Sequence, residues 1–142
     1  MKKIKIYSLA YCDSGGGAAT AFLRINSSLS KLNLINYPHV IEKRLSSPII
    51  KVHGNILDQI LRRIRFYITK IIFLFDLRYT KSINLIDSGV ANFINKKSYD
   101  IVNFHWIGCE TISLSEIKKI NKPIVWTLHD VGYIWNLSLQ FR

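Results

Sequence analysis

The chain has 142 residues, the size of a single domain, and 49% of them are hydrophobic against 20% charged. This composition excludes a disordered or collagen-like chain and is ordinary for a globular α/β protein. The 20 Lys and Arg residues outnumber the 9 Asp and Glu residues and give a net charge of +11, which either favours anionic partners such as phosphates, nucleic acid or a membrane, or reflects a composition rich in Lys, Ile and Asn.

The first predicted elements are a strand, a glycine loop and a helix. Residues 4–10 are mostly apolar, and Asp13, Ser14 and three consecutive glycines follow. Residues 18–32 then place apolar side chains three and four positions apart, which predicts an amphipathic helix. The members of that stripe are Ala18, Ala21, Phe22, Ile25, Leu29 and Leu32. This order opens a doubly wound α/β domain, and Lys5 interrupts the first apolar run, so we interpret it as a strand and not as a signal peptide.

The middle of the chain gives one weak and one strong pattern. Between residues 33 and 52, Pro38 and Pro48 separate short apolar pieces, and we expect one or two short strands there. Residues 55–77 have the spacing of a long amphipathic helix whose cations lie mostly off the apolar stripe. Those cations are Arg62, Arg63, Arg65 and Lys70. They argue against a membrane span, because each charge costs at least about 2.5 kcal/mol at bilayer depth.

Helices and strands alternate again in the last third of the chain. Residues 82–96 predict a helix, residues 100–106 a strand, residues 113–120 a short helix and residues 123–128 a buried strand. The pattern Ser113-Leu114-Ser115-Glu116 is typical of a capping box at the start of the short helix. The sequence therefore predicts an α/β fold, a Rossmann-like parallel sheet flanked by helices, in which residues 1–142 form a single domain.

Three polar segments each follow a predicted strand: residues 13–17, His105-Trp106 and His129-Asp130. Ligands of open α/β sheets bind outside the carboxyl ends of the strands, so we expect these segments to share one rim. Consecutive glycines allow backbone N–H groups to approach a phosphate, although a plain strand-to-helix turn would also use them. The loop has neither the dinucleotide GxGxxG nor the GxxxxGK[ST] pattern, so neither an NAD site nor an ATPase is indicated.

The aromatic and titratable residues of this rim have two interpretations each. His129 and Asp130 could contact a sugar hydroxyl or have a structural role, and Trp106 beside His105 could stack on a sugar ring or belong to the core. We place no third ligand that would complete a metal site. The two cysteines form no CxxC pair, which argues against a disulfide framework and favours the cytoplasm. We interpret Cys109 as an inert, partly buried thiol.

Four sequence blocks carry a resemblance to a known family. They are Asp-Ser-Gly-Gly-Gly-Ala-Ala at 13–19, Tyr-Asp-Ile-Val-Asn-Phe-His-Trp-Ile-Gly at 99–108, Leu-Ser-Glu-Ile at 114–117 and Lys-Pro-Ile-Val-Trp-Thr-Leu-His-Asp at 122–130. In this order they resemble the N-terminal half of bacterial family 4 glycosyltransferases, particularly those of exopolysaccharide and colanic-acid-like synthesis. The resemblance covers nearly the whole chain and is loose from residue 33 to residue 77.

The resemblance implies the acceptor-side half of a GT-B fold, in which two Rossmann-like domains face each other across a cleft. The activity would be retaining hexosyl transfer from a nucleotide-sugar to a polysaccharide or lipid-linked acceptor, without a metal or cofactor. Gly15, Gly16 and Gly17 would lie beside the donor diphosphate, and His129 would be the catalytic residue near the transferred sugar. The substrate-binding residues would be Ser14, His105, Trp106 and Asp130.

Departures from the family pattern leave other functions open. Residues 131–142 diverge, and no Glu-x7-Glu pattern of a donor domain occurs, since neither Glu42, Glu110 nor Glu116 has a Glu eight positions later. We therefore expect that the donor domain is absent and that the chain is inactive alone. The alternative is a module without catalysis that binds an acceptor or the inner face of the membrane, the latter through helix 55–77, which could instead pack on the sheet. Nucleic acid is not expected, because the cations are spread along the chain and no nucleic-acid-binding motif occurs.

Overall fold

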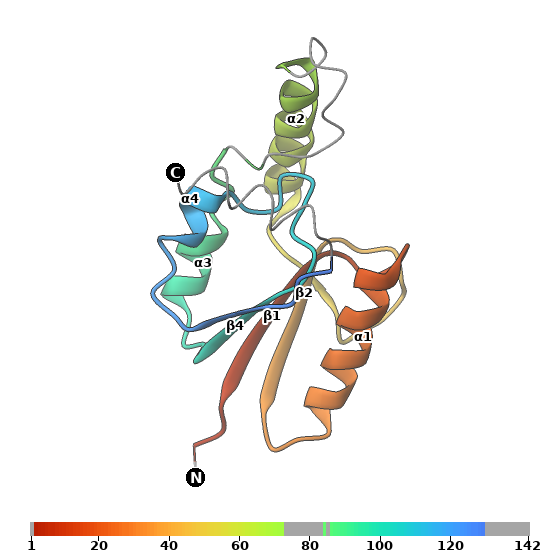
Figure 1. Cartoon of the computed structure of the whole chain (residues 1–142), viewed down its shortest axis with the longest axis vertical. Helices are drawn as coiled ribbons and strands as arrows, with labels where there is room; N and C mark the ends of the chain where they lie inside the picture. Colours follow the sequence, from red (N-terminus) through yellow and green to blue (C-terminus); the bar gives the residue numbers. More distant parts are fainter. Residues whose placement is uncertain (1, 73–83, 85, 130–142) are drawn as a thin grey trace.

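The computed structural model describes residues 2–72, 84 and 86–129, and these residues form a parallel sheet flanked by helices (Figure 1). The strands are β1 (Lys5–Cys12), β2 (Ile35–Glu42), β3 (Lys51–Val52), β4 (Ile101–Phe104) and β5 (Ile124–Trp126). Their order across the sheet is β3-β2-β1-β4-β5, and every neighbouring pair is parallel. The predicted Rossmann-like α/β architecture is confirmed. The divergent tail at 131–142 lies outside the described residues.

The helices lie in three positions relative to the sheet (Figure 1). Helix α1 (Gly17–Ser30) covers one face, and α3 (Val90–Lys96) and α4 (Leu114–Ile117) lie on the other. Helix α2 (Ile56–Ile72) projects away from the end of the molecule at which the strands finish. The predicted part of this helix beyond residue 72 lies outside the described residues.

Two hydrophobic clusters fill the space on the two faces of the sheet. Alternate residues of a strand point to opposite faces, and β1 accordingly directs Leu9 into one cluster and Ala10 into the other. The larger cluster joins the sheet to α3 and the loop after β4: Tyr7, Leu9, Ile41, Val90, Ile94, Val102, Phe104, Ile107 and Ile112. The smaller one joins the sheet to α1 through Phe22, which is fully buried.

Strand β2 is longer than the sequence predicted. It runs for eight residues through Pro38, where we expected an interruption. The short neighbour β3 pairs with β2 only at His39 and Val40, so within the described residues β2 is an edge strand at Pro38. Proline is tolerated at such a position because its nitrogen need not donate to a further strand.

The start of α3 corrects a second prediction. The expected helix from residue 82 begins at Val90, because Gly89 has a left-handed φ of 86° and the described residues 86–89 are not helical. Ile86 is consequently 41% exposed and does not face the core. Of the other residues expected to start this helix, Ser82 and Ile83 lie outside the described residues.

Helix α4 confirms the predicted cap in part. Ser113 is its N-cap and accepts a hydrogen bond from the Glu116 backbone N–H at 3.0 Å. The buried Glu116 carboxylate accepts from the backbone N–H groups of Ala91 at 2.9 Å and Ser88 at 2.7 Å. One acidic side chain therefore binds free N–H groups at the start of the neighbouring α3, where a negative charge also suits the helix dipole.

The burial of strand β5 is the last feature that differs from the prediction. The sequence predicted a buried strand, but Val125 is 53% exposed and Ile124 37%. In the described part of the chain β5 pairs with β4 alone, which makes it the edge of the sheet. Trp126 still packs against the larger hydrophobic cluster.

Candidate functional site

A cleft of about 630 Å³ lies at the carboxyl ends of the strands. The sheet order places β2 and β3 on one side of β1 and β4 and β5 on the other, so the loops after β1 and β4 diverge at this point. Open α/β sheets bind ligands at such a switch point. The cleft is lined chiefly by Tyr11, Gly15, Gly16, Gly17, Arg44, Trp106 and His129.

The structure brings most of the sequence-predicted site residues together. The three glycines, Trp106 and His129 line the same cleft, and His105 is fully buried in contact with His129. Ser14 is half-buried in the glycine loop, where its carbonyl accepts from the Cys12 thiol at 3.0 Å. Asp130 lies outside the described residues. The expectation that three segments share one rim therefore holds for their described parts.

The glycine loop has a backbone that few other residues could adopt. Gly15 has φ 90°, and Gly16, the N-cap of α1, has φ 142° and ψ 177°. The N-cap Gly16 has no side chain with which to cap the first N–H groups of α1, and the first turn of the helix contains no acidic residue. The positive end of the helix dipole and the loop amides thus remain available to an anion in the cleft.

Arg44 is held beside this loop by the buried carboxylate of Asp13. The backbone N–H groups of Arg44 and Leu45 donate to Asp13 Oδ1 at 2.7 Å and to Oδ2 at 3.2 Å, respectively. These bonds tie the loop after β1 to the loop after β2. The guanidinium lies so close to Gly15 that a Cβ added there would be 3.0 Å from Nη1. The loop after β2 therefore adds a cation to the glycine-lined wall.

Glu42 receives two donors at the edge of the cleft. Tyr11 donates its hydroxyl to Oε2 at 2.6 Å, and Arg44 Nε donates to Oε1 at 2.9 Å. The Tyr11 hydrogen bond, followed by the Arg44 interaction, lowers the pKa of Glu42. Burial and the bond to Glu42 raise the pKa of Tyr11 to about 12. Glu42 is therefore ionised and Tyr11 neutral at pH 7. The Tyr11 hydroxyl holds the Glu42 carboxylate, and this carboxylate orients the Arg44 side chain by accepting a hydrogen bond from its Nε.

Two aromatic rings form another wall of the cleft. Tyr11 and Trp106 lie edge to face, with ring centroids 5.4 Å apart and planes at 71°. The Tyr11 backbone N–H donates to the Trp106 carbonyl at 2.9 Å, which extends the pairing of β1 and β4 into the site. Aromatic faces of this kind suit the apolar C–H surface of a sugar ring.

A hydrogen-bonded chain leads from the sheet to His129. Asn103 Nδ2 lies 3.2 Å from His105 Nε2, and His105 Nδ1 lies 3.3 Å from His129 Nε2. Burial, with the neighbouring His129 as a smaller cause, lowers the pKa of His105 to about 4, so this ring is neutral at pH 7. With Asn103 donating, His105 carries its proton on Nδ1 and donates to His129, which keeps its own proton on Nδ1.

The same three side chains can also hold the opposite arrangement. Asn103 Oδ1 is buried and has no hydrogen-bond partner among the described residues. A half-turn of the Asn103 amide would present Oδ1 to His105 Nε2–H, and His105 Nδ1 would then accept from His129 Nε2–H. The chain thus accommodates His129 Nε2 either as acceptor or as donor, and the amide orientation of Asn103 is coupled to the tautomer of His105.

Sequence reasoning missed three residues of this site: Tyr11, Arg44 and Asn103. Tyr11 continues β1 past its predicted end, and Asn103 lies within the apolar run of β4. Arg44 follows the second strand, and the polar run Glu42-Lys43-Arg44 after Val40-Ile41 was the signal that could have found it. The thiol of Cys109 is half-buried, and burial raises its pKa, which agrees with an unreactive side chain.

Two wider observations bear on the site. Among the described residues, no three His, Cys, Asp or Glu side chains are grouped so that they could hold a metal ion. No protein-family model matches the chain, and neither the curated proteins nor the solved structures contain a significant match. The resemblance to glycosyltransferases thus stays a prediction from sequence.

Proposed function

We propose that this domain forms one half of a retaining glycosyltransferase active site. Its cleft would receive the nucleotide-sugar between the glycine loop and the aromatic wall, and an acceptor glycan or lipid-linked sugar at the same rim. The observation that carries the proposal is the convergence, in one cleft, of an anion-binding wall with aromatic rings and a histidine.

The chemistry of glycosyl transfer needs each of these parts. The leaving nucleoside diphosphate gains negative charge in the transition state, and loop amides, the start of α1 and Arg44 would stabilise it electrostatically. Tyr11 and Trp106 would orient the sugar ring. His129 would hydrogen-bond the transferred sugar or its acceptor. The contacts from Asn103 through His105 would set which ring nitrogen of His129 carries the proton. A second domain would supply the carboxylates of a donor site, since the sequence lacks the Glu-x7-Glu pattern.

The proposal can be tested by nuclear magnetic resonance titration of the 142-residue chain with UDP-glucose and GDP-mannose, with glucose and inorganic phosphate as partial ligands. We expect weak binding, with shifts concentrated at the amides of residues 15–19 and at the Trp106 indole. Absence of any shift, or shifts centred elsewhere, would contradict the proposal. Micromolar affinity, or sugar transfer by this chain alone, would overturn the assignment of donor binding and catalysis to two domains together.

A matched pair of variants sharpens this test. Arg44→Gln should weaken nucleotide-sugar binding several-fold, because it removes the cation beside the glycine loop. Arg24→Gln removes the same charge from an exposed position on α1 that does not line the cleft, and it should leave binding unchanged. Equal losses in both variants would indicate non-specific attraction to the net positive charge instead of a site.

A further inference from the structure

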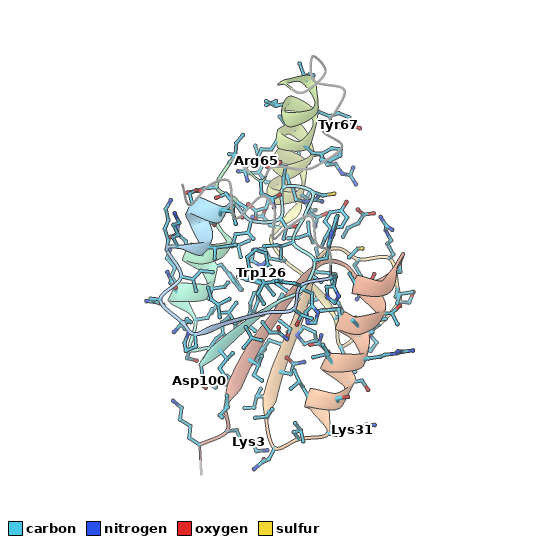
Figure 2. All side chains as sticks on the ribbon, viewed as in Figure 1. Lys3, Lys31, Arg65, Tyr67, Asp100 and Trp126 are labelled. Carbon is cyan, nitrogen blue, oxygen red and sulfur yellow. The ribbon has the colours of Figure 1, made fainter. Side chains whose placement is uncertain are left out.

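Helix α2 exposes its apolar side chains to solvent. Ile56 is 77% exposed, Tyr67 64% and Leu57 61%, and the pattern continues through the helix at Ile60, Leu61, Ile64, Ile68 and Ile71. Figure 2 shows Arg65 and Tyr67 on α2 at the end of the molecule opposite Lys3 and Lys31. A surface of this extent needs an explanation, because isolated apolar residues are ordinary on a protein but contiguous large patches mark interaction sites.

The two sides of α2 have different surroundings. At about 100° per residue, the eight exposed apolar residues fill one continuous arc of about 140°. The opposite side contacts the domain: Gln59 and Arg62 line a cavity of about 420 Å³ together with His39 and His53, and the Arg62 guanidinium lies over the Tyr11 ring at 5.8 Å. Phe66 is half-buried on this same side, so the helix faces the protein mainly, but not wholly, through polar groups and directs its apolar stripe outward, the reverse of a helix that covers a core.

The charges of α2 favour one occupant for this stripe. Arg63 and Arg65 border the apolar arc on its two sides, and Asp58 is the only acidic residue in the helix sequence. Asp58 is occupied at the first turn, where it accepts from the Asn55 backbone N–H at 2.8 Å. A second copy of this helix would bring arginines against arginines, whereas anionic headgroups above hydrocarbon complement both the cations and the stripe.

We propose that α2 docks the protein on an anionic membrane surface, with its axis in the plane of the interface. Its 17 residues give a length of about 25 Å. No helix in the described part of the chain is long and apolar enough to cross a bilayer, so α2 lies on the membrane. The net charge of +11 adds long-range attraction to anionic lipid. The inference is independent of glycosyl transfer, since no residue of the apolar stripe lines the cleft.

Vesicle flotation of the full 142-residue chain tests the inference. We expect retention on vesicles of phosphatidylcholine with about one-third phosphatidylglycerol, little retention on pure phosphatidylcholine, and a decrease as salt is raised. The double variant Ile60→Asp, Ile64→Asp should reduce partitioning about tenfold or more. Leu32→Asp changes an exposed apolar residue outside α2 and serves as the control, with unchanged binding expected.

Two outcomes of the flotation assay would overturn the proposal. One is equal retention of the wild type and the double variant. The other is no vesicle binding together with a concentration-dependent dimer that the double variant abolishes, which would assign the stripe to self-association. Hydrogen exchange of the wild-type chain provides a second test that does not depend on whether the double variant folds. Anionic vesicles should slow exchange in peptides from residues 56–71 and leave those from residues 17–30 unchanged, and unchanged exchange in both would also refute docking.

Discussion

Helices α1 and α2 arise from the same sequence pattern and occupy opposite environments. Both place apolar residues three and four positions apart, yet α1 buries Phe22 completely against the sheet whereas α2 leaves Ile64 49% exposed. The difference lies in what surrounds each stripe. The polar side of α1 faces water, but the polar side of α2 carries Arg62, which contacts Tyr11 at the cleft. Periodicity thus defines the face of a helix, and long-range contacts decide which face turns inward.

The largest expected effect tests this comparison directly. Phe22→Ala should lower the free energy of unfolding by about 3–5 kcal/mol, because it opens a cavity beside Val40 and Ile50 and removes the edge-to-face contact with His105. Ile64→Ala on α2 should change it by no more than about 0.5 kcal/mol, since the side chain is already half exposed. Urea denaturation followed by circular dichroism measures both. Comparable losses in the two variants would show that the α2 stripe is covered in solution.

The fold was predictable where local pattern and burial coincide. The strand, glycine loop and helix at the start of the chain, and the alternation at its end, gave the parallel sheet and the shared rim. The prediction of β2 was incomplete because Pro38 suggests a break, and only the shortness of β3 makes that proline acceptable. The predicted start of α3 was wrong because the helical spacing of apolar residues continues through residues 86–89. The observed start is set by Gly89 and by the carboxylate of Glu116, which lies 27 positions further along the chain.

The candidate site was predictable only in part, for a related reason. The glycines, Trp106 and His129 follow strands and were found from that position. Arg44 enters the cleft because the buried Asp13 binds the backbone beyond β2, a contact between residues 31 positions apart. In the sequence Asn103 interrupts an apolar strand, and its role becomes clear only from its contact with His105 in the structure. Polar residues that act through partners distant in sequence leave no local periodicity.

Two glycine variants test the start of α1, where the backbone conformation and not side-chain packing determines the stability. Gly16→Ala should cost about 2 kcal/mol of stability, because φ 142° with ψ 177° is a region that residues with a Cβ avoid, although an added Cβ would meet no atom. Gly17→Ala, at the first position of the helix with equally open space, should change stability by no more than about 0.5 kcal/mol.

Thermal and urea unfolding of the two alanine variants under the same conditions measures this difference. The pair is matched because the added methyl group and its surroundings are alike, so steric crowding cannot explain a gap between them. Equal stabilities would mean that the loop does not hold the Gly16 conformation in solution. In that case the available amides at the start of α1, on which the proposed binding of a diphosphate depends, would also be in doubt.

The smallest expected effect concerns the histidine that lies beneath α1. His105 is fully buried, and its pKa is lowered to about 4, whereas an unfolded histidine titrates near 6.5. Between these values the unfolded chain binds a proton that the folded chain does not. The stability from this residue is thus complete above about pH 6.5 and is lost as the pH falls toward 4. At pH 5.5 the loss from His105 should be about 1 kcal/mol relative to pH 7.5.

The variant His105→Gln isolates this contribution, because glutamine does not titrate but can still donate and accept hydrogen bonds. Its free energy of unfolding should fall by about 1 kcal/mol less than that of the wild type between pH 7.5 and pH 5.5. A remaining decrease is expected, since burial also lowers the pKa of His53, on the α2 side of the molecule, to about 4. An identical pH dependence in variant and wild type would mean that folding does not lower the pKa of His105, and its ring would then not be buried in solution as it is in the structure.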